Sequence, residues 1–191
     1  IQAYSGMMSI SGHKETGPVR SGYFSVDMST ALNAAFAISA ALLRRANTGE
    51  GQRVDVSMLD TAMFMQAPQM TGYLVTGNVP ELNGNASPTK QPTSNVFASS
   101  NGYVQIIAMK ETQVQALLTE LGMAERYADY DDPGKRLSKR QELNDLVAPL
   151  IGAQTTEHWL SALDAIGVPV SAIQDFPTIA SEPQLDHREV F

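Results

Sequence analysis

Hydrophobic positions are densest between Asp27 and Arg45, a segment with six alanines and no internal glycine or proline. This composition favours a helix, and because the apolar positions fall on all of its faces, we expect the helix to be buried. Arg44 and Arg45 stand at the end of the helix where cations interact favourably with its dipole. Asn47 to Gly51 then provides a stop signal.

The segments around this helix carry shorter patterns. Ile1 to Gly12 is typical of a short helix or turn that ends in glycine, and Gly17 to Val26 of a loop followed by a short extended piece. Arg53 to Val56 alternates polar and apolar residues, which predicts a short strand. We expect Ser57 to cap a second helix, with Asp60 at the position of a capping-box acid.

The second half of the chain alternates between strand and helix patterns. Residues 78–93 are rich in Asn, Pro, Ser, Thr and Gly, which is typical of a linker and marks a candidate domain boundary. Beyond it, Asn101-Gly102 separates two apolar runs and predicts a β-hairpin. The predicted elements are strands at 95–98, 103–109 and 168–173 and helices at 113–121, 139–151, 155–166 and 178–185. Together they predict a small α/β unit.

Composition limits the chemistry available to the chain. It has 191 residues and a net charge of −7, and this negative charge argues against a nucleic-acid binder. There is no cysteine, which excludes disulfides, thiol catalysis and cysteine-ligated zinc. His13, His158 and His187 are scattered without the spacing of a metal site, so we expect no metal.

The sequence gives little reason to expect a membrane protein. No signal-peptide pattern follows Ile1. The longest apolar stretch, Ala31 to Leu43, is too short to span a bilayer and contains Asn33 and Ser39. Together with the absence of cysteine, these observations lead us to expect a cytoplasmic protein without a membrane-spanning segment.

Asp27 is the candidate reactive group that the pattern itself provides. A carboxylate at the start of an apolar helix can act as a reactive acid in a dry pocket, favoured by the positive end of the helix dipole. The same carboxylate can instead cap backbone N–H groups of the first turn, a role that Asp fills in many helices. The residues alone favour capping, and both alternatives stay open.

A basic cluster, formed by Lys135, Arg136, Lys139 and Arg140, lies at the start of the predicted helix 139–151. Such a cluster is typical of a solvated helix start. The alternative is a contact to a phosphate-bearing cofactor, which needs only a local basic patch in an otherwise acidic chain.

One motif carries most of a family resemblance. Thr48 to Val56 (TGEGQRVDV), followed by Leu59-Asp60, resembles the family III CoA-transferases, which include formyl-CoA transferase, the CaiB/BaiF-type carnitine CoA-transferase and α-methylacyl-CoA racemase. Other parts of the chain resemble the same family. They are Ile1–Gly12, Gly17–Gly22, Asp27 at the start of its helix, Ala41–Arg45, Ile166–Asp175 and Glu182–Leu185. The resemblance covers nearly the whole chain.

The resemblance implies an α/β fold, with central helices of a Rossmann-like large domain and a small α/β domain. Residues 1–82 would be the C-terminal portion of the large CoA-binding and catalytic domain, 83–175 the linker and small α/β domain, and 176–191 a segment that returns to the large domain. Family members begin with a nucleotide-fold half that this sequence lacks, so the resemblance implies an internal fragment that is inactive alone. It also implies an interlocked homodimer.

The activity implied by the resemblance is CoA transfer from an acyl-CoA to a carboxylic acid acceptor, with coenzyme A as the acyl carrier and no metal. Asp27 would be the nucleophile that forms an aspartyl-CoA thioester. Asn83, Gly84 and Asn85 belong to a loop that resembles the mobile glycine-rich loop covering the transferase site. The loop from Asn83 to Pro88 has one glycine only.

Two alternatives stay open beside CoA transfer. In the racemase branch, Asp27 would transfer a proton at the carbon next to the thioester, and Glu111, at a strand-to-helix junction, would assist it. Glu111 also fits a helix-start acid that the dipole favours. In the other alternative, the chain is a non-catalytic CoA-binding or dimerisation module in which Asp27 only caps its helix.

Overall fold

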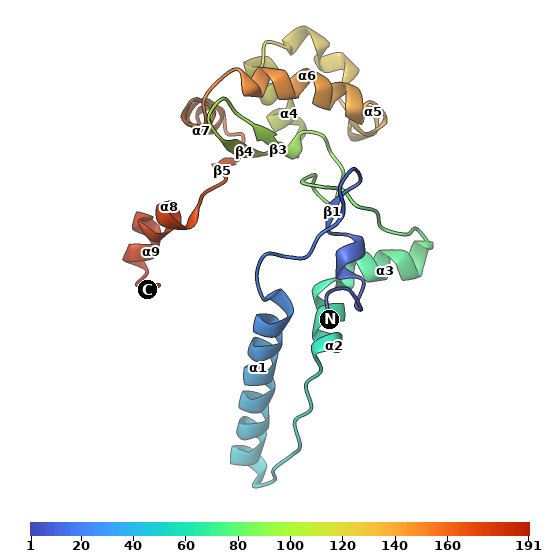
Figure 1. Cartoon of the computed structure of the whole chain (residues 1–191), viewed down its shortest axis with the longest axis vertical. Coiled ribbons are helices and arrows are strands. Elements are labelled where there is room, and N and C mark those ends of the chain that lie inside the picture. The colour runs from blue at the N-terminus through green and yellow to red at the C-terminus, as the bar shows by residue number, and fades with distance from the viewer. The chain divides into compact units, whose positions relative to one another are not determined.

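The computed structural model describes all residues from Ile1 to Phe191 (Figure 1). The chain forms two compact units, residues 1–84 and 85–191. The junction between these units falls inside the linker predicted at residues 78–93. The division into 1–82, 83–175 and 176–191, which assigns a functional part to each segment, stays a prediction.

The first unit combines helices with one small sheet. Its elements are the 3-10 helix η1 (Met7–Ser9), the strands β1 (Gly12–His13) and β2 (Gly17–Pro18), and the helices α1 (Ser25–Thr48), α2 (Met58–Met65) and α3 (Ala67–Thr76). The strands β1 and β2 pair antiparallel. This hairpin corrects the prediction that the segment from Gly17 begins as a loop, because Gly17 and Pro18 form β2. Gly12 has a φ of 125° and Gly17 a φ of 85°, and glycine adopts such angles without a steric penalty.

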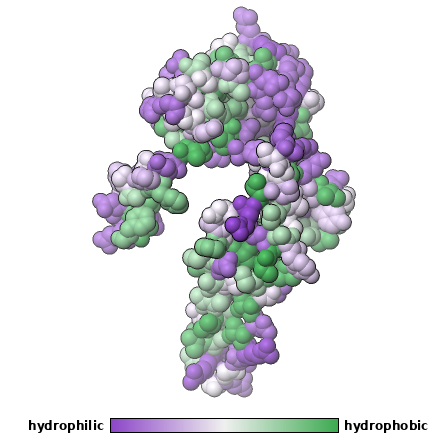
Figure 2. All heavy atoms as spheres, viewed as in Figure 1, coloured by the Kyte–Doolittle hydropathy of each residue, from purple (hydrophilic) through white to green (hydrophobic).

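Helix α1 confirms the long helix predicted from the sequence and extends it to residues 25–48. It ends at Gly49, which has a φ of 78° and donates its N–H to the carbonyl oxygen of Arg45 at 2.8 Å. The predicted burial of this helix is wrong for this chain, because only Ser25 and Val26 are buried. Helix α1 packs against α2, and one helix cannot cover apolar residues that lie on all faces. Figure 2 shows hydrophobic residues exposed along α1.

Length and composition alone would allow α1 to cross a membrane. Its 24 residues span about 36 Å. This length corrects the argument that the apolar stretch Ala31–Leu43 is too short to span a bilayer, because the helix that contains this stretch is longer. Core helices and signal sequences have the same length and composition, so this is weak evidence for a membrane segment.

Residues 49–57, between α1 and α2, form no strand, so the strand predicted at Arg53–Val56 is wrong. Polar and apolar residues do alternate over Arg53–Val56, but no neighbouring strand is present to pair with this segment. Ser57 caps α2 as predicted, since its Oγ accepts a hydrogen bond from the N–H of Asp60 at 3.2 Å. Gln66 separates α2 from α3, and α3 has a proline in its first turn.

The second unit consists of a three-stranded antiparallel sheet and helices. Its strands are β3 (Ser94–Ala98), β4 (Tyr103–Ile107) and β5 (Val170–Ala172), with β4 in the centre. Its helices are α4 (Glu111–Glu120), the 3-10 helix η2 (Ala124–Asp129), α5 (Pro133–Ser138), α6 (Arg140–Gly152), α7 (Thr156–Ala165), α8 (Phe176–Ala180) and α9 (Pro183–His187). The predicted hairpin is confirmed, because Ala98 and Tyr103 pair across its turn. The helix predicted at 178–185 is two short helices, since a proline begins the second one.

A single hydrophobic core holds the second unit together. Val104 and Ile106 alternate with exposed residues along β4 and have no exposed surface. Leu117 of α4 and Leu163 of α7 are equally buried and belong to the same core. The indole N–H of Trp159 donates to the carbonyl oxygen of Ile151 at 2.7 Å, so this buried ring also has its polar atom satisfied.

Candidate functional site

Asp27 lies in the first turn of α1, after Phe24 at the N-cap position. The side chain of Phe24 makes no capping hydrogen bond. The carboxylate of Asp27 is exposed in this chain and forms neither a hydrogen bond nor an ion pair. The capping role that the residues alone favour is therefore absent from the structure. A carboxylate at this end of a helix is still favoured by the dipole.

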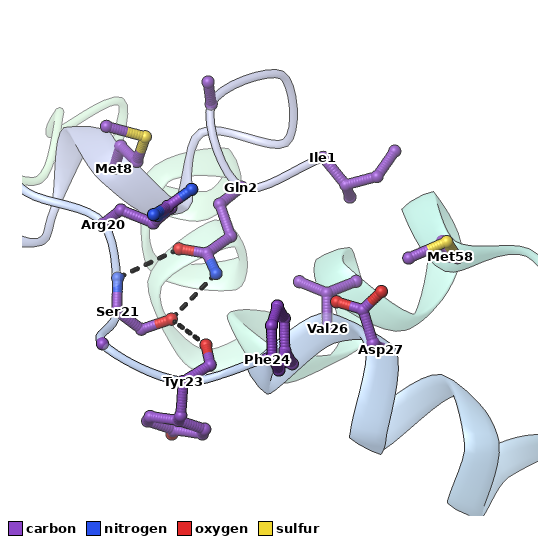
Figure 3. Close-up of a pocket in the computed structure, with 12 residues that line it drawn as sticks. Ile1, Gln2, Met8, Arg20, Ser21, Tyr23, Phe24, Val26, Asp27 and Met58 are labelled. Atoms are coloured by element: carbon purple, nitrogen blue, oxygen red, sulfur yellow. Dashed lines mark hydrogen bonds between the residues drawn. The ribbon is translucent and has the colours of Figure 1, made fainter.

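A pocket of about 410 Å³ adjoins Asp27 in the first unit. This volume is within the range of ~300–1,000 Å³ that is usual for small-molecule sites. Asp27 is the one acidic residue and Arg20 the one basic residue of its lining. Figure 3 shows the lining side chains, which come from the N-terminal segment, the Arg20–Asp27 segment and α2. The full lining is Ile1, Gln2, Ala3, Met8, Arg20, Ser21, Gly22, Tyr23, Phe24, Val26, Asp27 and Met58.

Hydrogen bonds of Gln2 fix the wall of this pocket. Its Nε2 donates to Ser21 Oγ at 2.8 Å and to Ser25 Oγ at 3.3 Å, and its Oε1 accepts from the N–H of Ser21 at 3.1 Å. Ser21 Oγ also donates to the carbonyl oxygen of Tyr23 at 3.0 Å. The N-terminal segment and the turn before α1 are thereby joined, and Asp27 follows that turn directly.

The predicted loop residues lie at the boundary between the units. The N–H of Gly84 donates to the carbonyl oxygen of Gly12 at 2.8 Å, so the loop is attached to the β1–β2 hairpin. Gly84 has a φ of 59°, and a Cβ at this position would lie 2.5 Å from Nδ1 of His13. Asn83 and Gly84 do not line the pocket of Asp27, and Asn85 is the first residue of the second unit. Their role as a mobile loop over the site stays a prediction.

Glu111 begins α4, at the predicted strand-to-helix junction of the second unit. Its Oε2 accepts from Nη1 of Arg136 at 2.8 Å, and its Oε1 accepts from Nη2 at 2.7 Å. The hydrogen bonds from Arg136 lower the pKa of Glu111 below its usual value, which keeps the carboxylate ionised. These contacts are those of an ion-pair partner. A role in proton transfer stays a prediction.

The basic cluster divides in the structure, which corrects the prediction of a solvated group. Arg136 is buried, whereas Lys135, Lys139 and Arg140 are not. Arg136 is satisfied inside the unit by Glu111, by Gln91 and by the carbonyl oxygen of Tyr130. These bonds use four of its five N–H donors, and with its side chain 1% exposed Arg136 presents almost no surface to a phosphate group. No group of three or more His, Asp and Glu side chains lies close enough to hold a metal ion.

The family model for CoA-transferase family III matches residues 1–191. The chain belongs to CoA-transferase family III. Among solved structures, it is similar to a CaiB/BaiF family protein from Brucella suis, with a TM-score of 0.85 and 30% identity over 98% of this chain and 50% of that one. The α/β fold that the sequence resemblance implied is thereby confirmed.

Curated relatives of this family III chain are named as CoA-transferases. The succinyl-CoA:mesaconate CoA-transferase of Haloarcula marismortui is 31% identical over 99% of this chain and 47% of the relative. The succinate–glutarate CoA-transferase of Agrobacterium fabrum is 28% identical over 98% of this chain and 47% of the relative. The chain thus spans about half the length of the curated relatives that it matches.

Sequence reasoning missed the other polar residues of this family III pocket. Gln2 and Arg20 fall within segments that resemble the family, but neither stands out as a functional residue in the sequence. The signal that could have indicated Arg20 is its place seven residues before Asp27, in a turn rich in glycine and serine. Gln2 could not be found in this way, because its hydrogen bonds reach across 19 and 23 residues.

Proposed function

We propose that the whole protein transfers CoA between carboxylic acids, with Asp27 as the nucleophile. The observation that carries the proposal is the unpartnered carboxylate of Asp27, the one acid that lines the pocket. Membership of CoA-transferase family III supports the reaction class. The acids in the names of the two relatives described above, succinate, mesaconate and glutarate, are dicarboxylic.

The proposed reaction proceeds through covalent exchange at Asp27. A carboxylate oxygen of Asp27 attacks the thioester carbonyl carbon of the acyl-CoA, the carbon–sulfur bond breaks, and CoA leaves as a thiolate. The thiolate then attacks the carbonyl carbon of Asp27 in the resulting mixed anhydride, and the acyl group leaves as a carboxylate. The product is an aspartyl-CoA thioester. The acceptor acid reverses these two steps and leaves as its CoA ester.

The start of α1 offers groups suited to this chemistry. The backbone N–H groups of Val26 and Asp27 make no hydrogen bond, as is usual in a first helical turn. Donors of this kind stabilise the negative oxygen that forms when a carbonyl carbon is attacked. Ile1, Met8 and Met58 give the pocket an apolar lining. Exclusion of water by such a lining would protect the anhydride from hydrolysis.

An exchange assay with the whole protein tests the proposal. The protein is incubated with succinyl-CoA and a panel of carboxylic acids, and new acyl-CoA esters are identified by mass spectrometry. We expect an acceptor acid from the panel to appear as its CoA thioester while succinate is released. If no ester forms with any acid while the α-proton of an acyl-CoA exchanges with deuterated water, the protein is a racemase. If neither reaction occurs, the non-catalytic alternative is favoured.

A further inference from the structure

The side chains that line the pocket of Asp27 include one of each charge. Arg20 is its one basic residue, and its guanidinium forms no hydrogen bond and no ion pair. No ion pair joins Arg20 to Asp27, although both line the same pocket. Figure 3 shows Arg20 beside Met8 and Gln2, and Asp27 beside Val26 and Phe24. Each charge thus has neutral side chains beside it.

The backbone on both sides of Arg20 is anchored. Before it, the N–H of Val19 donates to the carbonyl oxygen of Ser11 at 2.8 Å. After it, the N–H of Ser21 donates to Gln2 Oε1 at 3.1 Å. The backbone at Arg20 is therefore held by its neighbours, while the five N–H donors of its exposed guanidinium stay available for a ligand. The anchored backbone lowers part of the entropic cost of binding, and ordering of the side chain by the ligand makes up the rest.

On the basis of the proposed function, we infer that Arg20 binds the distal carboxylate of a dicarboxylic acid whose other carboxyl group reacts at Asp27. A guanidinium matches a carboxylate with two parallel hydrogen bonds. The monothioester of a dicarboxylic acid carries a negative charge that Asp27 would repel, and Arg20 offsets this repulsion. A monocarboxylic acyl group has no charge for Arg20 to bind. Arg20 therefore selects dicarboxylic over monocarboxylic acids.

The test compares acids of equal carbon number in the whole protein. Succinate and butyrate differ in that butyrate has a methyl group where succinate has its second carboxylate, and kcat/KM is measured for each as acceptor. We expect Arg20→Met to lower the ratio of kcat/KM for succinate to that for butyrate by about tenfold to a hundredfold, the usual effect of losing a charged hydrogen bond. Arg20→Lys keeps the charge without the planar fork, so it should lose less.

Arg53→Met is the matched control, because Arg53 is exposed, lies in the same unit and does not line the pocket. It should leave the ratio unchanged. Equal unfolding midpoints of the three variants and the unsubstituted protein would show that folding is intact.

Three outcomes would overturn the inference. An unchanged ratio in Arg20→Met, with exchange activity retained, removes Arg20 as the selecting residue and leaves the proposed function standing. An equal rise in KM for every acyl-CoA, whatever its acyl group, assigns Arg20 to a phosphate of CoA. Absence of exchange with every acid of the panel in the unsubstituted protein removes the proposed function and this inference with it.

Discussion

Arg136 and Glu111 form an ion pair whose two side chains differ sharply in exposure. The side chain of Arg136 is 1% exposed, whereas that of Glu111 is 43% exposed. The cation therefore depends on this carboxylate, on Gln91 and on the carbonyl oxygen of Tyr130 for compensation of its charge. Removing one partner of a buried ion pair is costly because the other charge is left uncompensated.

We expect Glu111→Gln to destabilise the second unit by about 2 kcal/mol, below the ~3–5 kcal/mol typical of fully buried pairs, because solvent screens the exposed carboxylate. The single tryptophan, Trp159, lies in the core of this unit, so its fluorescence during urea titration reports this unfolding. Glu120→Gln is the matched control. Glu120 is exposed at the end of the same helix and pairs with nothing, so its substitution should change stability by less than ~0.5 kcal/mol.

The same experiment has a pH dependence with a definite sign. The folded-state pKa of Glu111 is lowered from its ordinary value of 4.5, so its stabilising contribution is present above that pH and is lost as the pH falls. The difference between the unsubstituted chain and Glu111→Gln should therefore shrink below about pH 4.5. Equal stability of the two chains at neutral pH would contradict the assigned ion pair.

Tyr130 predicts a loss of stability at alkaline pH. Burial, together with its hydrogen bond to Glu142, raises the pKa of Tyr130 from 10.0 to about 12. Because the folded-state pKa is raised, the contribution of the neutral phenol is complete below pH 10 and is lost between pH 10 and about pH 12. Trp159 fluorescence should show a fall in urea midpoint over this range. The fall should be smaller in Tyr130→Phe, and an equal fall in both chains would contradict this assignment.

Replacement of Gly84, in the loop that follows α3, should destabilise the first unit. Gly84→Ala should destabilise the first unit by about 1–3 kcal/mol, because its φ of 59° strains an alanine and the new Cβ meets the ring of His13. Gly77→Ala is the matched control, since Gly77 has a φ of 73° with nothing within 4 Å of a Cβ. Urea unfolding followed by circular dichroism measures both. The difference in stability between Gly84→Ala and Gly77→Ala should be smaller in a chain that also carries His13→Ala. If it is not smaller, the contact with His13 does not cause the difference.

The exposed residues of α1 predict self-association of this 191-residue chain. Leu32 is 72% exposed and Phe36 is 76% exposed, and apolar surfaces of this kind drive association. Sedimentation analysis should show oligomers that decrease in Phe36→Gln. Phe176→Gln, at a position 89% exposed in the second unit, should change association less. A monodisperse, cooperatively folding monomer would contradict this prediction.

Local patterns in the sequence predicted most elements but not their burial. The hairpin at 94–107 and the helix at 25–48 follow from turn residues and from helix-forming residues, which act over short distances. Whether α1 is buried depends on partners that a pattern does not contain. The strand predicted at Arg53–Val56 failed for the same reason, because a strand needs a neighbour for its hydrogen bonds.

The site shows the same limit. Asp27 could be named from its place at the start of an apolar helix, and the family resemblance indicated its role as well as Glu111. The burial of Arg136 could not be predicted from the sequence, because its partners Gln91 and Glu111 lie 45 and 25 residues away along the chain. Arg20 has no partner at all in this chain, and only the lining of the pocket relates it to Asp27.

Asp27→Asn separates catalysis from stability. Asn keeps the size of the side chain, so stability should change by less than about 1 kcal/mol. An amide is a poor nucleophile at this step, so exchange activity of the whole protein should fall by orders of magnitude. Intact-mass analysis of the purified variant checks that deamidation has not restored the aspartate. Near-normal turnover would remove Asp27 as the nucleophile.

The most direct measurement of the central claim is mass spectrometry of the peptide that contains Asp27, after hydroxylamine is added during turnover. Hydroxylamine attacks an aspartyl thioester or anhydride and leaves a hydroxamate, whereas it does not react with a free carboxylate. We predict a hydroxamate on Asp27 that forms only when acyl-CoA is present, together with loss of exchange activity. An unmodified Asp27 in protein that continues to exchange CoA between acids would contradict the account.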